Sequence, residues 1–176
     1  MSKKFDVIII GAGAAGMMSA IESGKRGRKV LLVDHYKKIG EKIRISGGGR
    51  CNFTNIHTSP NKFLSQNPKF VRSALSQYTQ NDFINLIKKY EIKFHEKKLG
   101  QLFCDQSAQQ IVEMLLKECE LTNVTILKEF IIKNVSKDNN QYLVSTATDT
   151  YSSESLIIAT GGLSVPKIGA TSFGYE

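Results

Sequence analysis

Residues 5–34, FDVIIIGAGAAGMMSAIESGKRGRKVLLVD, constrain the fold of this chain more than any other feature. The run 7–10 is β-branched and continuously apolar, as in a parallel strand that helices cover on both faces. A glycine turn follows, then a helical pattern over 14–26, then an apolar strand over 30–33 that ends at Asp34. This order predicts an α/β fold that begins with the βαβ unit of a Rossmann-like parallel sheet.

The three glycines of the turn have the spacing GxGxxG, in which each position has its own steric reason. Gly11 permits the tight turn, Gly13 lets a phosphate approach the backbone, and Gly16 lets the helix lie close to the strand. The N–H groups of Ala14, Ala15 and Gly16 then point from the helix N-terminus toward an anion. We therefore expect a pyrophosphate at this turn.

Asp34 follows the glycines by about 20 residues, where a carboxylate accepts hydrogen bonds from a ribose diol. We include His35, its neighbour, among the cofactor-binding candidates. An ordinary glycine-rich turn would explain the glycines alone, but not a helix, a second strand and an acid in register with them.

Composition fits one soluble α/β domain over residues 1–176, with 41% apolar residues. The N-terminal apolar run is too short and too polar for a signal or a membrane span, so we expect a cytoplasmic protein without a membrane partner. Cys51, Cys104 and Cys119 have no CxxC spacing, and the three histidines are scattered. These patterns predict neither a disulfide framework nor a metal site.

The formal charge of +8 raises the question of a nucleic-acid partner. The densest basic stretch comprises Lys88, Lys89, Lys93, Lys97 and Lys98. It lacks a recognisable module with interleaved aromatic residues, and isolated basic stretches are usually solvated surface. We expect no nucleic-acid partner.

A second glycine-rich segment, GEKIRISGGGRCNFTN, occupies residues 40–55. Three successive glycines allow a backbone to wrap closely around a ligand. We expect this segment to face the same ligand, although a flexible surface loop would have a similar composition. Its candidate ligand-binding residues are Lys42, Ser46, Gly47, Gly48, Gly49, Arg50 and Cys51.

The chain resembles the aminoacetone-oxidase-like family of FAD-binding flavoproteins, a branch of the glutathione-reductase-type superfamily. The resemblance rests on IIGAGAAGMM, on the run from Lys42 to Asn55, on GQLFCDQSAQQIVEML and on ATGGLSVPKIGAT, which together span nearly the whole chain. It implies an FAD-dependent oxidoreductase acting on a small amine or on an unsaturated or carbonyl compound, with a nicotinamide or oxygen as electron partner.

The resemblance also implies further cofactor contacts. Strand 156–159 would rejoin the parallel sheet and bring Thr160, Gly161 and Gly162 near the cofactor, and Phe130 would lie near adenine. Because a flavin carries electron transfer itself, no catalytic side chain is required, and we name none. Cys51 allows two interpretations. The positive charge of its loop could lower the pKa of the thiol and make it reactive. Free cysteines are more often small packed side chains, which is the interpretation that we favour.

Between the motifs, helical patterns cover 68–78, 81–90 and 107–120, with a capping box at Ser107 and Gln110. A strand is expected at 124–127, and runs 130–135, 141–146 and 150–153 predict an antiparallel β-meander. The fold class is thus α/β, with a Rossmann-like parallel sheet and an antiparallel β-meander.

The chain departs from the family at three points. Asp34 replaces a usual glutamate, and Ser172 and Phe173 replace glycine and aspartate. Family members are also much longer, so we expect an N-terminal portion that lacks an insert domain and a C-terminal FAD-completing segment, and that self-associates through the exposed apolar face. A non-catalytic remnant and an NAD-dependent dehydrogenase are the alternatives.

Overall fold

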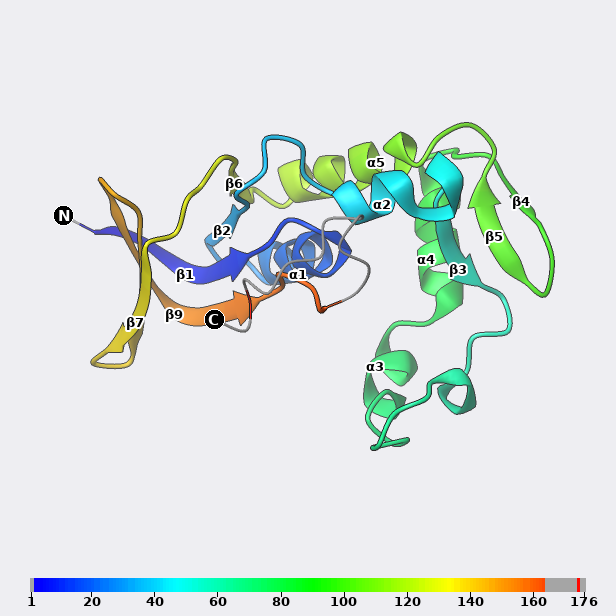
Figure 1. Ribbon diagram of the computed structural model, residues 1–176, viewed down its shortest axis with the longest axis horizontal. Helices are drawn as coiled ribbons and strands as arrows, with labels where there is room; N and C mark the ends of the chain where they lie inside the picture. The colour runs from blue at the N-terminus through cyan, green and yellow to red at the C-terminus, as the bar shows by residue number, and fades with distance from the viewer. Residues whose placement is uncertain (1, 164–173, 175–176) are drawn as a thin grey trace. The chain divides into compact units, whose positions relative to one another are not determined.

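The computed structural model describes residues 2–163 and 174, and Figure 1 shows its chain coloured from the N-terminus to the C-terminus. Two compact units divide the chain: unit 1 comprises 1–43 and 115–176, and unit 2 comprises 44–114. The part of the ATGGLSVPKIGAT motif from residue 164 on lies outside the described residues, as do Ser172 and Phe173. Among the described residues, no helix is long and apolar enough to cross a membrane.

The described part of unit 1 is built on one sheet with the strand order β6-β2-β1-β9-β8-β7. Strands β6, β2, β1 and β9 run parallel, and β7 and β8 add to β9 as an antiparallel hairpin. The strand bounds are β1 Lys3–Ile10, β2 Val30–Val33, β6 Thr125–Leu127, β7 Asn134–Asp138, β8 Gln141–Ser145 and β9 Thr150–Ile158. The predicted α/β class, with a parallel Rossmann-like sheet and an antiparallel portion, is confirmed.

Strand β9 belongs to both portions of this sheet. Its first residues, Thr150 to Ser153, pair antiparallel with β8, while Tyr151 to Ile158 pair parallel with β1, beside which β9 runs in Figure 1. The expectation of two strands, 150–153 and 156–159, is wrong in this respect. No glycine, proline or asparagine interrupts residues 150–158, so nothing in the chain ends the strand between them.

The core of unit 1 lies where the predicted apolar runs meet. All four residues of β2 are fully buried, as are Ile8 and Ile9 of β1. Helix α1 (Ala14–Lys25) turns Met17, Ala20 and Ile21 inward at helical spacing. It ends at Lys25, one residue before the predicted Arg26.

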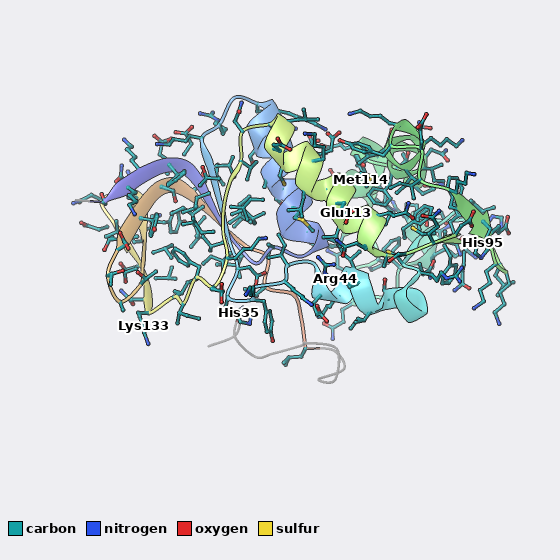
Figure 2. All side chains as sticks on the ribbon, turned by 90° about the horizontal axis from the view of Figure 1, so that it is seen from above. His35, Arg44, His95, Glu113, Met114 and Lys133 are labelled. Carbon is teal, nitrogen blue, oxygen red and sulfur yellow. The ribbon has the colours of Figure 1, made fainter. Side chains whose placement is uncertain are left out.

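The division between the two units falls within helix α5 (Gln109–Leu121), on which Figure 2 labels Glu113 and Met114. In unit 1, Cys119 Sγ lies 3.8 Å from the backbone oxygen of Met17. The predicted capping box at the start of α5 is wrong. Ser107 Oγ accepts from the Gln109 N–H at 3.1 Å, and the side-chain oxygen of Gln110 has no hydrogen-bond partner.

Unit 2 contains a sheet that the sequence did not predict, with the order β3-β5-β4. Its antiparallel strands are short: β3 is Asn52–Asn55, β4 is Phe94–Glu96 and β5 is Gln101–Cys104. Strands of three or four residues carry too little alternation to be recognised in a sequence. The remaining elements are α2 (Glu41–Ile45), η1 (Ser46–Gly49), η2 (Pro60–Lys62), α3 (Arg72–Gln77) and α4 (Gln80–Lys89).

Several predicted elements differ in their bounds. Helix α3 covers only part of 68–78, whereas α4 begins one residue before the predicted 81–90, behind a capping box of Thr79 and Asp82. The strand expected over 130–135 begins at Asn134, so Phe130 precedes it in a loop. The prediction failed there because a short apolar run does not by itself distinguish a strand from a loop.

Candidate functional site

The glycine turn of unit 1 is held by contacts that leave no room for side chains at two of its positions. Gly11 has a φ of +103°, and a Cβ there would lie 2.5 Å from the backbone oxygen of Ala159. A Cβ on Gly16 would lie 1.8 Å from the backbone oxygen of Gly11. These two glycines are therefore required by the close approach of the turn to α1 and to the end of β9.

Gly13 differs from both of its neighbours in the motif. A Cβ built on it would meet no atom within 4 Å. The Met17 N–H donates to the Gly13 oxygen at 3.0 Å, which is the first hydrogen bond of α1. The N–H groups of Ala14, Ala15 and Gly16 precede this bond and have no acceptor within the helix. Open space thus adjoins a helix N-terminus, where the partial positive charge attracts anions.

Asp34 ties the end of β2 to this turn. One carboxylate oxygen accepts from the Ala12 N–H at 2.7 Å, and the other accepts from the Tyr36 N–H at 2.9 Å. The side chain is 12% exposed, with His35 Nδ1 at 3.6 Å from it. Since each carboxylate oxygen has a second lone pair, Asp34 can still accept from a hydroxyl donor. Phe130 joins the same corner, because its N–H donates to the Asp34 backbone oxygen at 2.9 Å.

We expect Asp34→Ala to weaken FAD binding by about 1–3 kcal/mol, because a charge-assisted hydrogen bond to the ribose is lost. Stability should fall as well, since the N–H groups of Ala12 and Tyr36 lose their acceptor. Asp34→Asn is the matched control, because its amide oxygen still accepts one hydrogen bond. FAD titration and urea unfolding measure the two effects. An unchanged dissociation constant for Asp34→Ala would exclude this side chain as the ribose ligand.

Residues from two further segments of unit 1 lie beside the glycine turn. A Cβ on Gly11 would lie 3.0 Å from Thr160 Cα, and one on Gly161 would lie 3.3 Å from Lys42 Nζ. Gly162 follows them and is exposed. Of the predicted site residues, unit 1 thus brings together the glycine turn, Asp34, His35, Phe130, Thr160, Gly161 and Lys42.

The predicted residues 46–51 belong to unit 2, where they form a tight turn. Gly47 and Gly48 have positive φ values of 58° and 67° within the η1 helix. The ends of the turn are fixed, because the Cys51 N–H donates to the Ser46 oxygen at 3.0 Å and the Ala108 N–H donates to the Gly49 oxygen at 2.7 Å. Backbone hydrogen bonds therefore define this segment, contrary to the alternative of a flexible loop.

Sequence reasoning missed two residues that position this turn. A Cβ on Gly47 would lie 2.7 Å from the ring of Phe103, so the ring packs directly against the glycine backbone. The Arg50 guanidinium donates to the backbone oxygen of Asp105 at 2.6 Å. Both partners lie in or just after β5, about 50 residues further along the chain. No local pattern connects them to the turn.

The cysteines of the described chain are free and buried. Burial raises the pKa of the Cys51 thiol, while a hydrogen bond with Ser46 opposes this rise. Burial likewise raises the pKa of Cys104 to about 11, helped by the nearby Cys51, and the pKa of Cys119 to about 11. The hypothesis that the loop lowers the Cys51 pKa is therefore wrong, and the packed side chain remains.

These raised pKa values predict a loss of stability at alkaline pH. From pH 9.0 to about 11, unfolded Cys104 and Cys119 lose protons that the folded chain retains. Above this window, deprotonation favours the unfolded state by on the order of 2 to 3 kcal/mol for each thiol. Urea midpoints across the window measure the effect. The control is the double variant Cys104→Ala with Cys119→Ala, whose urea midpoint should fall less steeply with rising pH than that of the parent chain. If the midpoints of both proteins fall equally steeply, the prediction is contradicted.

Known proteins match this chain over nearly its whole length. The model of the HI0933-like protein Rossmann domain matches residues 5–176, and the chain belongs to this family. It is 55% identical over 174 residues to the ribosomal RNA dihydrouridine synthase of Escherichia coli, covering 99% of this chain and 44% of that protein. It is 48% identical over 180 residues to the protein of that name from Haemophilus influenzae, covering 100% of this chain and 45% of that protein. The chain thus spans less than half the length of these relatives.

Among solved structures, the chain is similar to the 3-ketosteroid-delta4-(5alpha)-dehydrogenase from Rhodococcus jostii RHA1. The TM-score is 0.64 at 12% identity, over 91% of this chain and 46% of that one. At such low identity the likeness concerns the fold, which this chain shares with an oxidoreductase.

The names of the two close relatives correct two expectations. Both are named for action on ribosomal RNA, which contradicts an oxidoreductase for a small amine or a small unsaturated or carbonyl compound. They also contradict the expectation of no nucleic-acid partner. That expectation failed because it required a recognisable RNA-binding module, and a basic surface can bind RNA without one. The enzyme class itself agrees with the relatives' names.

Proposed function

We propose that this member of the HI0933-like Rossmann-domain family is the FAD-binding part of an enzyme that reduces uridine in ribosomal RNA to dihydrouridine. The observation that carries the proposal is the match of nearly the whole chain to two relatives of that name, at 55% and 48% identity. The formal charge of +8 supports it, because RNA attracts cationic proteins through its phosphates.

Dihydrouridine carries one more hydrogen on each of two neighbouring ring carbons than uridine does, so its synthesis is a reduction of a carbon–carbon double bond. A bound FAD supplies the hydride and electron transfer that such a reduction needs. The part of this chain would be to hold FAD, orient it and admit the uridine. From the aminoacetone-oxidase-like resemblance we retain only this mode of FAD binding.

The described residues fit FAD in three respects. Open space at Gly13 adjoins the N–H groups of α1, which suits a pyrophosphate. The Asp34 carboxylate keeps a lone pair on each oxygen for a ribose diol. Lys42 lies beside Gly161, close enough to the turn to add a positive charge. Within unit 1 we assign the adenine side to Phe130 and His35, the phosphates to the turn at Gly11–Gly16, and the flavin side to Thr160–Gly162. That Ser46–Cys51 also contact the cofactor stays a prediction.

A binding titration tests the cofactor. The purified chain should take up FAD, retain its visible absorption through gel filtration and lose that absorption on reduction. NAD in excess should not displace it, since an NAD-dependent dehydrogenase leaves residues 46–51 without a role. A colourless protein that binds no FAD, or one that prefers NAD, would overturn the assignment.

The RNA reaction needs a second test. Unmodified ribosomal RNA, transcribed in vitro, is incubated with the chain, FAD and a reduced nicotinamide, and its nucleosides are analysed by mass spectrometry. Dihydrouridine formed only with FAD supports the function. Retained FAD without dihydrouridine would confine the role of these residues to cofactor binding. Such an enzyme works where ribosomes are assembled, which agrees with the expected cytoplasmic location.

A further inference from the structure

The small sheet of unit 2 has two faces of opposite character. On one face, Phe53 of β3 packs edge-to-face on Phe94 of β4 at 5.5 Å and against Phe83 of α4 at 6.1 Å. Ile84 and Ile87 of α4 are buried. This face is therefore the apolar interior of unit 2, covered by α4.

The other face presents basic and polar side chains. His95 pairs with Phe103 across β4 and β5, and strand alternation places Lys93 and Lys97 on the same face as His95. Their positions agree with the contacts: the Asp105 N–H donates to the Lys93 oxygen, and Lys97 Nζ lies 5.2 Å from the centre of the Phe103 ring. Lys93, His95 and Lys97 are all exposed.

A ring platform lies at the centre of this face. His95, labelled in Figure 2, stacks on Phe103 with an interplanar angle of 18° and a centroid distance of 6.3 Å. The His95 side chain is 48% exposed. Its Nδ1 is fixed by Asp105 Oδ1 at 2.7 Å. Phe103 itself is only 8% exposed, because Gly47 of the turn at Ser46–Gly49 covers the edge of its ring. The ring platform thus lies beside the turn at Ser46–Gly49, which the sequence predicts to contact the cofactor.

A carboxylate lies on this face. It is that of Asp105, whose Oδ1 lies 2.7 Å from His95 Nδ1 and whose side chain is 41% exposed. The Asp105 backbone oxygen accepts from the Arg50 guanidinium, which brings a positive charge beside this carboxylate. Glu96 belongs to the opposite side of β4 by strand alternation, where its carboxylate accepts from the Gly100 N–H at 3.1 Å. A phosphate backbone on this face would meet Arg50, Lys93 and Lys97.

We propose that this basic face, defined by Arg50, Lys93, His95, Lys97 and Phe103, binds the RNA strand that carries the target uridine. The inference rests on the proposed function and assigns its RNA-binding surface. Lys93 and Lys97 contact phosphates, while the exposed side of the His95 ring stacks on an unpaired base, as aromatic residues do in single-strand recognition. The ring platform then directs the strand toward the turn at Ser46–Gly49 of the same unit.

The test compares two charge-reversed variants of the whole 176-residue chain, with FAD present. Lys93→Glu with Lys97→Glu removes the proposed contacts, and Lys133→Glu with Lys137→Glu makes the same change, at the same spacing, on exposed lysines of unit 1 (Figure 2). The probe is unmodified ribosomal RNA transcribed in vitro, followed by fluorescence anisotropy or filter binding at several salt concentrations.

We expect the Lys93/Lys97 variant to bind RNA about tenfold to a hundredfold more weakly than the parent chain. The slope of the logarithm of its binding constant against the logarithm of the salt concentration should be shallower by roughly 1.5. The Lys133/Lys137 variant should change affinity less than about threefold, a factor that reflects only the net charge. Equal losses in the two variants, or no detectable RNA binding by the parent chain, would overturn the inference.

The ring platform has its own test. His95→Ala should weaken binding severalfold, and His95→Phe should restore it, because a phenyl ring still stacks. If both variants lose affinity equally, base stacking at this position is excluded. FAD content is measured in every variant, because it distinguishes the two proposals. A variant that loses RNA binding but retains FAD reports on this face alone. A parent chain that binds no FAD contradicts the proposed function.

Discussion

Gly13→Val should leave the fold of this chain intact and abolish its retention of FAD. The position is open in the structure, since a Cβ there meets no atom within 4 Å. Its backbone, with φ −83° and ψ −169°, is extended and acceptable to valine. The branched side chain would then occupy the space where a pyrophosphate must approach the N–H groups of α1. We expect affinity to fall at least a thousandfold, or about 4 kcal/mol.

Two measurements are needed on this variant. Far-UV circular dichroism and the urea midpoint should match the parent chain, and FAD titration should give the loss. Gly13→Ala is the graded control, with a smaller defect because one methyl group fills less of the space. A folded Gly13→Val protein with the parent's flavin content would refute the dinucleotide assignment.

Gly16→Ala should have the opposite profile, with its largest effect on folding. Its Cβ would lie 1.8 Å from the Gly11 backbone oxygen, an atom that no side-chain rotation can move. Alanine is favoured over glycine inside a helix by about 1 kcal/mol, but overpacking against a fixed backbone costs about 1–3 kcal/mol or more. Because α1 must move away from the turn, we expect a net loss of about 2–4 kcal/mol.

The control for this experiment is built into the motif. Gly13→Ala makes the same substitution three positions earlier and meets no atom. Urea unfolding of both variants should show a clear fall in the midpoint for Gly16→Ala alone. If the two midpoints agree, the close contact between α1 and the turn does not contribute to stability.

Much of unit 1 could be predicted from local patterns. The apolar run of β2, predicted over 30–33, is found at Val30–Val33, and α1 differs from its prediction by one residue. These elements are determined locally, since their apolar period and glycine positions allow only one arrangement. The same patterns indicated the turn and Asp34 as a pair, and the structure joins them through the Ala12 N–H. Their role in binding FAD remains a prediction.

The function could be predicted only in part. The glycine motifs indicated a dinucleotide site, but no pattern in the sequence indicated the ribosomal RNA for which the two close relatives are named. The basic stretch at 88–98 does not by itself predict an RNA site, because the sequence does not show which aromatic ring lies on the same face as its lysines. Phe103 lies on the neighbouring strand and meets His95 only through the pairing of β4 with β5.

The sequence by itself determined the βαβ unit, its glycine turn and the acid at the end of β2, because each depends on residues close together in the chain. Only the tertiary structure decided the contacts between residues that are distant in the chain or lie on different strands. It merged two predicted strands into β9, buried the cysteines, and placed Phe103 against Gly47 and His95. Such contacts join residues about 50 or more positions apart, or on different strands, and strand pairing and packing, rather than local propensity, determine them.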